Sequence, residues 1–147
     1  GISSAFAAAA YAGIPLTHRG VSASVAVTTG VRVGAKADLG VNADTLVVLM
    51  GVADLRQIAI DLIKAGRRAE TPVAVIRAAT NKQQSVVTGT LRTIADAVDS
   101  AGLRAPAVIV VGEVVHLREK LKWFEGDPAR AQAAAAGGGE FFGGMRH

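Results

Sequence analysis

The sequence predicts an α/β domain built on a mixed sheet of about five strands with helices on its faces. Short apolar runs bounded by proline, glycine or polar residues are typical of strands that are buried on both faces. Between these runs, apolar residues recur at i, i+3, i+4 and i+7, as in helices that cover a sheet. One connection between two strands is too short for a crossover helix, so that pair should be antiparallel and the sheet mixed.

The chain opens on an alanine-rich helix, which we expect to run from Ser3 or Ser4 to about Ala12. A serine hydroxyl at its start can cap the first free amides, and Gly13 with Pro15 should end it. A natural protein rarely begins at a helix cap without an initiator methionine. We therefore expect the chain to be the C-terminal piece of a longer protein.

Several elements should follow before the middle of the chain. A proline-bounded polar loop (residues 14–20) leads into a short strand (residues 24–29). Residues 30–44 have little periodicity and are long enough to form a mobile loop over a site. After the strand at 45–50, an apolar stripe predicts a helix over 54–65 that Gly66 ends.

Residues 45–50 should form the central strand, because five apolar residues run there without a charge. Ligands of open α/β sheets bind just beyond the carboxyl ends of strands, so a crevice should open after Met50. Gly51 would let other backbone approach closely there. Met50 could equally be ordinary core filler, since apolar strand ends usually just pack.

The second half of the chain should add two strands, a helix, a last strand and a short helix. The strand at 72–76 is followed after a polar turn by one at 86–90, which we expect to be antiparallel to it. An amphipathic stripe then predicts a helix over 91–101, and Pro106 precedes a buried strand at 107–111. A short basic and aromatic helix should end this part, from Leu117 to Phe124.

Composition narrows the class of partner. The net charge is +4 and the isoelectric point is near 10.0, but lysine and arginine alternate with acidic residues, so we expect no nucleic-acid partner. The absence of cysteine fits a reducing compartment, and the cytoplasm is the default location. The apolar opening at residues 2–16 is too short to span a bilayer and has no preceding basic residues, so we expect no membrane association.

Common site motifs are missing from the sequence. No Gly-x-Gly-x-x-Gly follows a predicted strand, and neither a Walker pattern nor a nucleophile elbow is present. His18, His116 and His147 lie far apart with no carboxylate or imidazole at helical spacing, so we expect no metal site. Motif chemistry alone therefore indicates a globular domain with a crevice.

Four segments carry a family resemblance. Tyr-Ala-Gly-Ile-Pro-Leu-Thr-His-Arg-Gly (11–20), Thr-Leu-Val-Val-Leu-Met-Gly (45–51), the Thr-x-x-x-Gln turn with Val-Thr-Gly-Thr-Leu (80–91) and Val-Val-Gly-Glu-Val-Val-His-Leu-Arg-Glu-Lys-Leu-Lys-Trp-Phe (110–124) occur in order. Together they resemble the uroporphyrinogen-III C-methyltransferases of the tetrapyrrole methylase superfamily. The match covers residues 1–125.

The resemblance implies a two-lobed enzyme with S-adenosylmethionine in the cleft between its lobes. Residues 1–125 look like the C-terminal lobe of that fold, and the Ala/Gly-rich residues 126–147 should be a disordered tail. The implied reaction methylates uroporphyrinogen III at C2 and C7, which gives precorrin-2 for sirohaem or cobalamin, and releases S-adenosylhomocysteine. The family's acid and base lie in the missing N-terminal lobe, so no catalytic residue can be named in this chain.

The resemblance also implies which residues contact the cofactor. Family members read Pro-Gly-x-(Thr/Ser)-(Ala/Ser) at the lobe junction, which puts Ser3 and Ser4 in contact positions. Met50 falls on the family's cofactor-contacting methionine. Ala79 falls on a position that is often glycine, so this contact requires a negative φ at Ala79.

A substrate with many carboxylates would favour positive charge, which makes Arg19, Arg77 and Lys82 candidate substrate contacts beside ordinary surface roles. The expected partners are a tetrapyrrole, the missing N-terminal lobe and a second copy in a homodimer. Two alternatives stay open. The chain could be a non-catalytic α/β binding or dimerisation module, or a methylase for another tetrapyrrole such as a cobalamin precursor.

Overall fold

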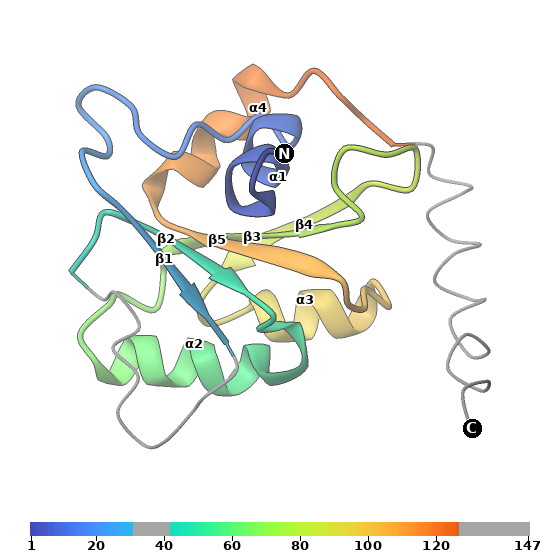
Figure 1. Cartoon of the computed structure of the whole chain (residues 1–147). Coiled ribbons are helices and arrows are strands. Elements are labelled where there is room, and N and C mark those ends of the chain that lie inside the picture. The colour runs from blue at the N-terminus through green and yellow to red at the C-terminus, as the bar shows by residue number, and fades with distance from the viewer. Residues whose placement is uncertain (31–41, 127–147) are drawn as a thin grey trace.

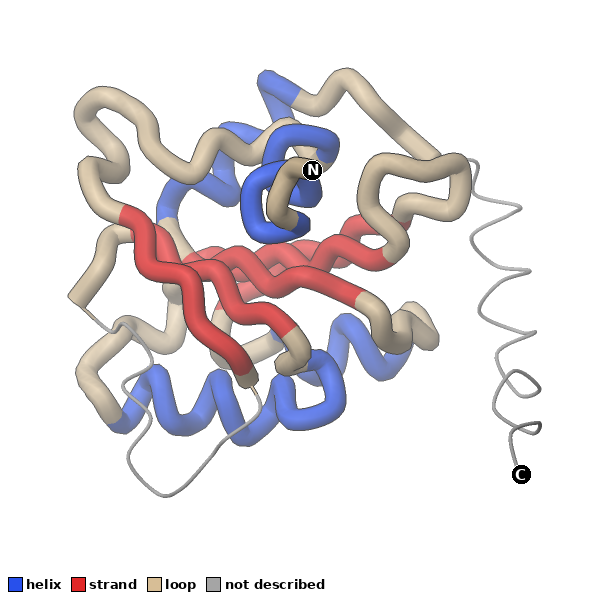
Figure 2. Tube along the Cα trace, viewed as in Figure 1, coloured by secondary structure: helices blue, strands red, loops and turns tan. Residues whose placement is uncertain are grey.

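The structure is a computed structural model that describes residues 1–30 and 42–126, and these form three layers with a five-stranded sheet in the middle (Figure 1, Figure 2). The predicted mixed α/β architecture is confirmed. One face of the sheet carries α1 (Ser4–Tyr11), the 3-10 helix η2 (Glu113–Leu117) and α4 (Arg118–Leu121). The other face carries α2 (Leu55–Lys64), which the short 3-10 helix η1 (Val52–Asp54) precedes, and α3 (Ile94–Ser100).

The sheet has the strand order β1-β2-β5-β3-β4. Its strands are β1 (Val25–Thr29), β2 (Thr45–Leu49), β3 (Pro72–Arg77), β4 (Ser85–Thr90) and β5 (Ala107–Val111). Only β1 and β2 pair in parallel, and the predicted antiparallel pairing of β3 with β4 is confirmed. Because β5 is antiparallel to both β2 and β3, those two strands run the same way and end at one edge of the sheet.

The expectation that residues 45–50 form the central strand is wrong. β5 lies in the middle, between β2 and β3, and β2 is next to the edge strand β1. β2 and β5 both have apolar residues facing both helical layers, so local pattern does not distinguish a middle strand from its neighbour. Long-range pairing decides that order.

Two apolar cores lie on the two faces of the sheet, as the continuous apolar run of β2 predicts. Leu46 and Val48 contribute to the core under α2 and α3, whereas Val47 faces α1. The buried stripe of α1 consists of Ala5, Ala8 and Ala9, and the buried C-cap residue Ala12 continues it. Side chains this small let the helix axis lie close to the strands, which brings the start of α1 near the sheet edge.

Two helices differ from their predicted bounds. α3 begins at Ile94 rather than at residue 91, because the backbone N–H of Thr90 donates to the Thr93 hydroxyl at 3.0 Å and closes a turn first. α4 ends at Leu121 rather than at residue 124. Lys122 is extended, and its backbone crosses Gly13 so closely that a Cβ there would lie 2.7 Å from the Lys122 Cα.

Two expectations lie outside the described residues. They are the mobile loop, most of which falls on residues 31–41, and the disordered tail after Gly126. In the part of the chain that the structure describes, no helix has the length and apolar character needed to cross a membrane.

Candidate functional site

A cavity of about 750 Å³ opens at the edge of the sheet where β2 and β3 end, as the sequence predicts. Backbone from five places converges there: the start of α1, the ends of β2 and β3, η1 and the start of β5. The lining residues are Ser4, Leu49, Met50, Val52, Ala53, Ile76, Ala78, Ala79, Asn81, Ala105, Pro106, Ala107 and Val108. No charged side chain occurs among these residues, so the cavity wall is apolar with a serine hydroxyl and an asparagine amide as its polar side chains.

Met50 lies at the mouth of this cavity and not in a core. Its side chain is 67% exposed, and its backbone has a φ of +54°, just after the last residue of β2. Residues with a Cβ rarely adopt this left-handed conformation, and strained positions of this kind cluster at functional sites. The core-filler interpretation of Met50 therefore has no support from its burial.

Gly51 lies in close contact with other backbone, as the sequence predicts. A Cβ built on Gly30 would lie 2.3 Å from the Gly51 Cα, so the chain after β1 passes against the chain after β2 with no room for a side chain. The backbone N–H of Gly30 also donates to the Leu49 carbonyl at 2.7 Å. This contact fixes the backbone on which Met50 is placed.

Ser3 and Ser4 have different roles at the start of α1. Ser3 is the N-cap, and its hydroxyl accepts a hydrogen bond from the backbone N–H of Ala5 at 3.3 Å. Ser4 lines the cavity, whereas Ser3 does not. The structure thus brings Ser4, Met50 and Ala79 together and leaves the Ser3 hydroxyl engaged in the helix cap.

Ala79 satisfies the condition that its cofactor role requires. It is absent from the residues with positive φ, although its neighbours Ala78 (φ +47°) and Thr80 (φ +72°) both have this conformation. The backbone N–H of Ala78 donates to the Pro106 carbonyl at 3.4 Å, which ties the turn to the segment before β5. These left-handed residues were not predictable, because alanine and threonine disfavour this region.

The three basic candidates lie outside the cavity lining. Arg19 is exposed in the loop before β1, near the N-terminal end of that strand and so at the other edge of the sheet. Lys82 is exposed beside the lining residue Asn81. Arg77 is the last residue of β3, and its Nε and Nη1 atoms are buried without a hydrogen-bond partner in the described part of the chain.

Comparison with known proteins places the chain in a family. The model of the tetrapyrrole (corrin/porphyrin) methylases matches residues 1–95, which is more than half of the chain. The chain belongs to the tetrapyrrole methylase family.

Relatives of this methylase chain are longer. It is 47% identical over 139 residues to a siroheme synthase of Stutzerimonas stutzeri. The matched segment covers 91% of this chain and 29% of the relative. A siroheme synthase of Pseudomonas fluorescens is 49% identical over 131 residues, 86% of this chain and 28% of the relative. The chain therefore spans less than a third of the length of these curated relatives.

Solved methyltransferases share its fold. Uroporphyrin-III-C-methyltransferase from Thermus thermophilus matches 82% of this chain and 52% of its own, with a TM-score of 0.71 and 34% identity. A second structure of the Thermus enzyme, complexed with S-adenyl homocysteine, matches 74% of this chain and 51% of its own (TM-score 0.64, 34% identity). A cobalt precorrin-4 methyltransferase also has a TM-score of 0.71, with 26% identity, over 78% of this chain and 51% of its own.

Asn81 is a cavity residue of this methylase chain that sequence reasoning did not single out. Its Oδ1 accepts a hydrogen bond from the backbone N–H of Gln83 at 2.9 Å, so the side chain also shapes the turn after β3. The signal was present in the Thr-Asn-Lys-Gln-Gln sequence after a strand end, because asparagine there is typical of a side-chain-closed turn.

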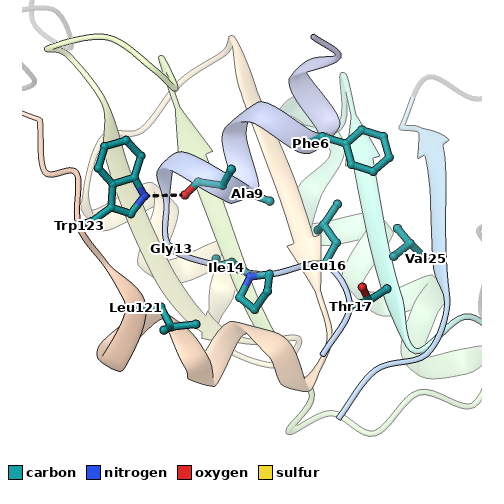
Figure 3. A pocket seen from close by; sticks show the side chains of 11 residues that line it. Phe6, Ala9, Gly13, Ile14, Leu16, Thr17, Val25, Leu121 and Trp123 are labelled. Carbon is teal, nitrogen blue, oxygen red and sulfur yellow. Dashed lines mark hydrogen bonds between the residues drawn. The ribbon is translucent and has the colours of Figure 1, made fainter. Parts of the chain in front are cut away.

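The Trp-Phe ending of the resemblance lies away from this cavity. Trp123 donates a hydrogen bond from Nε1 to the Ala10 carbonyl at 3.0 Å and lines a second cavity of about 600 Å³ with Phe6, Ile14 and Leu121 (Figure 3). Its ring centroid is 4.9 Å from that of Tyr11. The motif thus fixes the end of the described chain on α1, and no candidate site residue lines this second cavity.

Proposed function

We propose that this chain is the C-terminal lobe of an S-adenosylmethionine-dependent uroporphyrinogen-III C-methyltransferase. One observation carries the proposal. Ser4, Met50 and Ala79, which lie far apart in sequence and which the family resemblance assigns to the cofactor, line one cavity at the strand edge. The complex of the Thermus enzyme with S-adenyl homocysteine supports the same class of cofactor.

The cavity fits the cofactor in size and chemistry. A volume of about 750 Å³ is large enough for a nucleoside with an amino-acid tail. Alanine and proline side chains leave flat, close walls for an adenine ring, and the Met50 thioether is polarizable. The cavity wall has no charged side chain that would repel the cofactor's sulfonium. It also has none to bind the cofactor's carboxylate, which must therefore contact another surface.

When bound, S-adenosylmethionine supplies an electrophilic methyl group that an electron-rich pyrrole carbon can accept. The residues of this chain would mainly align and desolvate that group. In this proposal Met50 and the turn at Ala79 form one wall of the site and exclude water from it. Ser4 and Asn81 offer the polar contacts that orient the ligand. Residues 1–125 form this lobe, and residues 126–147 are a tail without a role in it.

Arg77 differs from the other two basic candidates because part of its guanidinium is buried. Its buried Nε and Nη1 donors have no protein partner in the described residues, and a buried donor without an acceptor costs free energy. Protein atoms already cover these two donors, so a tetrapyrrole carboxylate would reach them only if the neighbouring side chains moved. Arg19 and Lys82 remain proposals that rest on their charge alone.

The complete enzyme would include an N-terminal lobe that closes the cleft and provides the catalytic residues. The share of each relative that the chain spans supports this view. We further propose a cytoplasmic homodimer.

A tetrapyrrole other than uroporphyrinogen III is less well supported, since the cobalt precorrin-4 methyltransferase is 26% identical whereas the uroporphyrin-III enzyme is 34% identical.

The test is to sequence the gene upstream of Gly1 and assay the protein that it encodes. We expect a Gly-rich loop after a first strand, a Gly-Gly-Asp segment, and transfer of two labelled methyl groups to uroporphyrinogen III. If these segments are absent and no methyl transfer occurs, the chain is a binding or dimerisation module. Transfer only to a later corrin precursor would replace the substrate.

A further inference from the structure

A buried glutamine lies behind the wall of the cavity. Gln84 is 4% exposed and precedes the first residue of β4. Its Oε1 accepts a hydrogen bond from the backbone N–H of Thr80 at 2.9 Å, and its Nε2 donates to the Tyr11 carbonyl at 3.2 Å. Only this orientation of the amide lets Oε1 accept from the Thr80 N–H while Nε2 donates to the Tyr11 carbonyl.

The first of these bonds acts on a turn that is unfavourable by itself. Ala78 and Thr80 both have left-handed backbone, and threonine, which is β-branched, pays heavily in steric repulsion there. The bond to Thr80, and one from the backbone N–H of Gln84 to the Asn81 carbonyl at 2.9 Å, hold the turn closed. Ala78, Ala79 and Asn81 from this turn line the cavity.

The second bond attaches the turn to α1. Tyr11 is the last residue of that helix, and its ring contacts Trp123 and Phe124 at centroid distances of 4.9 and 5.1 Å. Ser4, at the first turn of the same short helix, lines the cavity. Gln84 therefore connects two walls of the cavity, the turn after β3 and the helix that carries Ser4.

Gln84 itself does not line the cavity. We propose that Gln84 is a positioning residue for the cofactor site, whose side-chain amide fixes the Ala78–Asn81 turn and its distance from α1 before the ligand arrives. This proposal rests on the proposed function, because it takes the cavity as the cofactor's. A preformed wall avoids the ordering cost that a loose turn would add to binding.

The test compares Gln84→Met with Gln83→Met in the 147-residue chain. Methionine is close to glutamine in shape, so Gln84→Met removes both hydrogen bonds with little change in volume. Gln83 is the matched control, because the interaction in this turn is through its backbone N–H, which the substitution retains. S-Adenosylhomocysteine is titrated to millimolar concentration, and amide shifts at Met50 and Ala79 are followed by nuclear magnetic resonance.

We expect Gln84→Met to stay folded, to speed hydrogen exchange at the Thr80 amide at least tenfold, and to reduce the slope of shift against ligand concentration about tenfold. Gln83→Met should match the unaltered chain in its Thr80 hydrogen exchange and in its slope of shift against ligand concentration. If Gln84→Met binds as well as the unaltered chain, Gln84 is a structural residue only and the proposal is overturned. If the unaltered chain shows cavity shifts neither alone nor within the full-length protein, the cofactor assignment fails, and the positioning role fails with it.

A measurement on the unaltered chain keeps the proposal testable even if Gln84→Met does not fold. The scalar coupling across the Thr80 N–H to Gln84 Oε1 bond reports that bond directly in the unaltered chain. We expect a resolved coupling. A Thr80 amide that exchanges freely and shows no coupling would overturn the proposal whatever happens to the variant.

Discussion

At the scale of single residues, the candidate site consists of side chains that lie far apart in the sequence and meet at one cavity. Ser4, Met50 and Ala79 line one cavity, as the family pattern implies. The left-handed backbone at Met50 and Thr80 could not be predicted, since local preference opposes it and only surrounding contacts impose it. The position of Gln84 behind the wall could not be predicted either, because it depends on a contact 73 residues away.

Met50→Ala separates binding from packing. Since 67% of the Met50 side chain is exposed, its loss should change the free energy of unfolding by less than about 1 kcal/mol, against about 2–5 kcal/mol for a buried methionine. In the proposed full-length methyltransferase, the apparent KM for S-adenosylmethionine should rise several-fold, because the proposed cofactor contact is lost. Urea unfolding and steady-state kinetics measure the two effects.

Val27→Ala is the control, since Val27 is 47% exposed on β1 and does not line the cavity. It should leave the KM unchanged. A large loss of stability in Met50→Ala with unchanged cofactor kinetics would return Met50 to a packing role.

At the scale of elements, the sequence predicted the helices and strands and their types. It did not predict all of their boundaries or the order of the strands in the sheet. All five strands of the described sheet were predicted. Apolar runs indicated β2, β3 and β5, because burial on both faces requires such runs, whereas partial alternation indicated β4. The start of α3 was missed because the Thr90 to Thr93 turn competes with the helix. The position of β5 between β2 and β3 depends on pairing across distant parts of the chain.

A polar contact joins the segments that lead into the parallel strands β1 and β2. The Asp44 carboxylate accepts hydrogen bonds from the backbone N–H groups of Ala23 and Ser24, at 2.9 and 3.2 Å, and from the Ser24 hydroxyl at 3.1 Å. The bond from Ala23, and then the other bonds, lower the pKa of Asp44 below its ordinary value of 3.8. The ionised carboxylate is therefore the form that stabilises this junction.

Asp44→Asn should therefore destabilise the chain at neutral pH and progressively less in acid. A carboxyl whose folded pKa is lowered contributes its full stability above the unfolded value near 3.8, and loses it as the pH falls through the folded pKa. Urea unfolding of both proteins from pH 7 to pH 3 measures the difference. A gap that stays constant over this range would show that ionisation of Asp44 does not matter.

At the scale of the whole molecule, the described fold ends where the C-terminal segment is fixed on α1. A Cβ built on Gly126 would lie 2.2 Å from the Gln84 carbonyl oxygen, so the chain is in close contact up to that residue. Residues 127–147 are mostly alanine and glycine, with Phe141, Phe142 and Met145 as the large apolar exceptions. From this composition we propose that the segment buries too little apolar surface to offset its chain entropy.

Truncation after Gly126 should leave the melting temperature, the oligomer size and the turnover of the full-length enzyme unchanged. Truncation before Trp123 should lower the melting temperature by several degrees, because it removes the ring contacts with Tyr11 and the bond to Ala10. Calorimetry and light scattering compare the two. A lower melting temperature or a lost dimer after the shorter truncation would show that the aromatic pair in the tail is structural.

The central claim is that this chain contributes one wall of a cofactor cleft. A ligand that loses the opposite wall loses much of its buried area and the groups that align it. The most direct measurement is isothermal calorimetry of the isolated 147-residue chain with S-adenosylmethionine, combined with a methyl-transfer assay on uroporphyrinogen III. We predict a dissociation constant weaker than about 100 μM, at the weak end of the affinity scale, and no transfer. Micromolar binding, or any turnover by this chain alone, would contradict the claim.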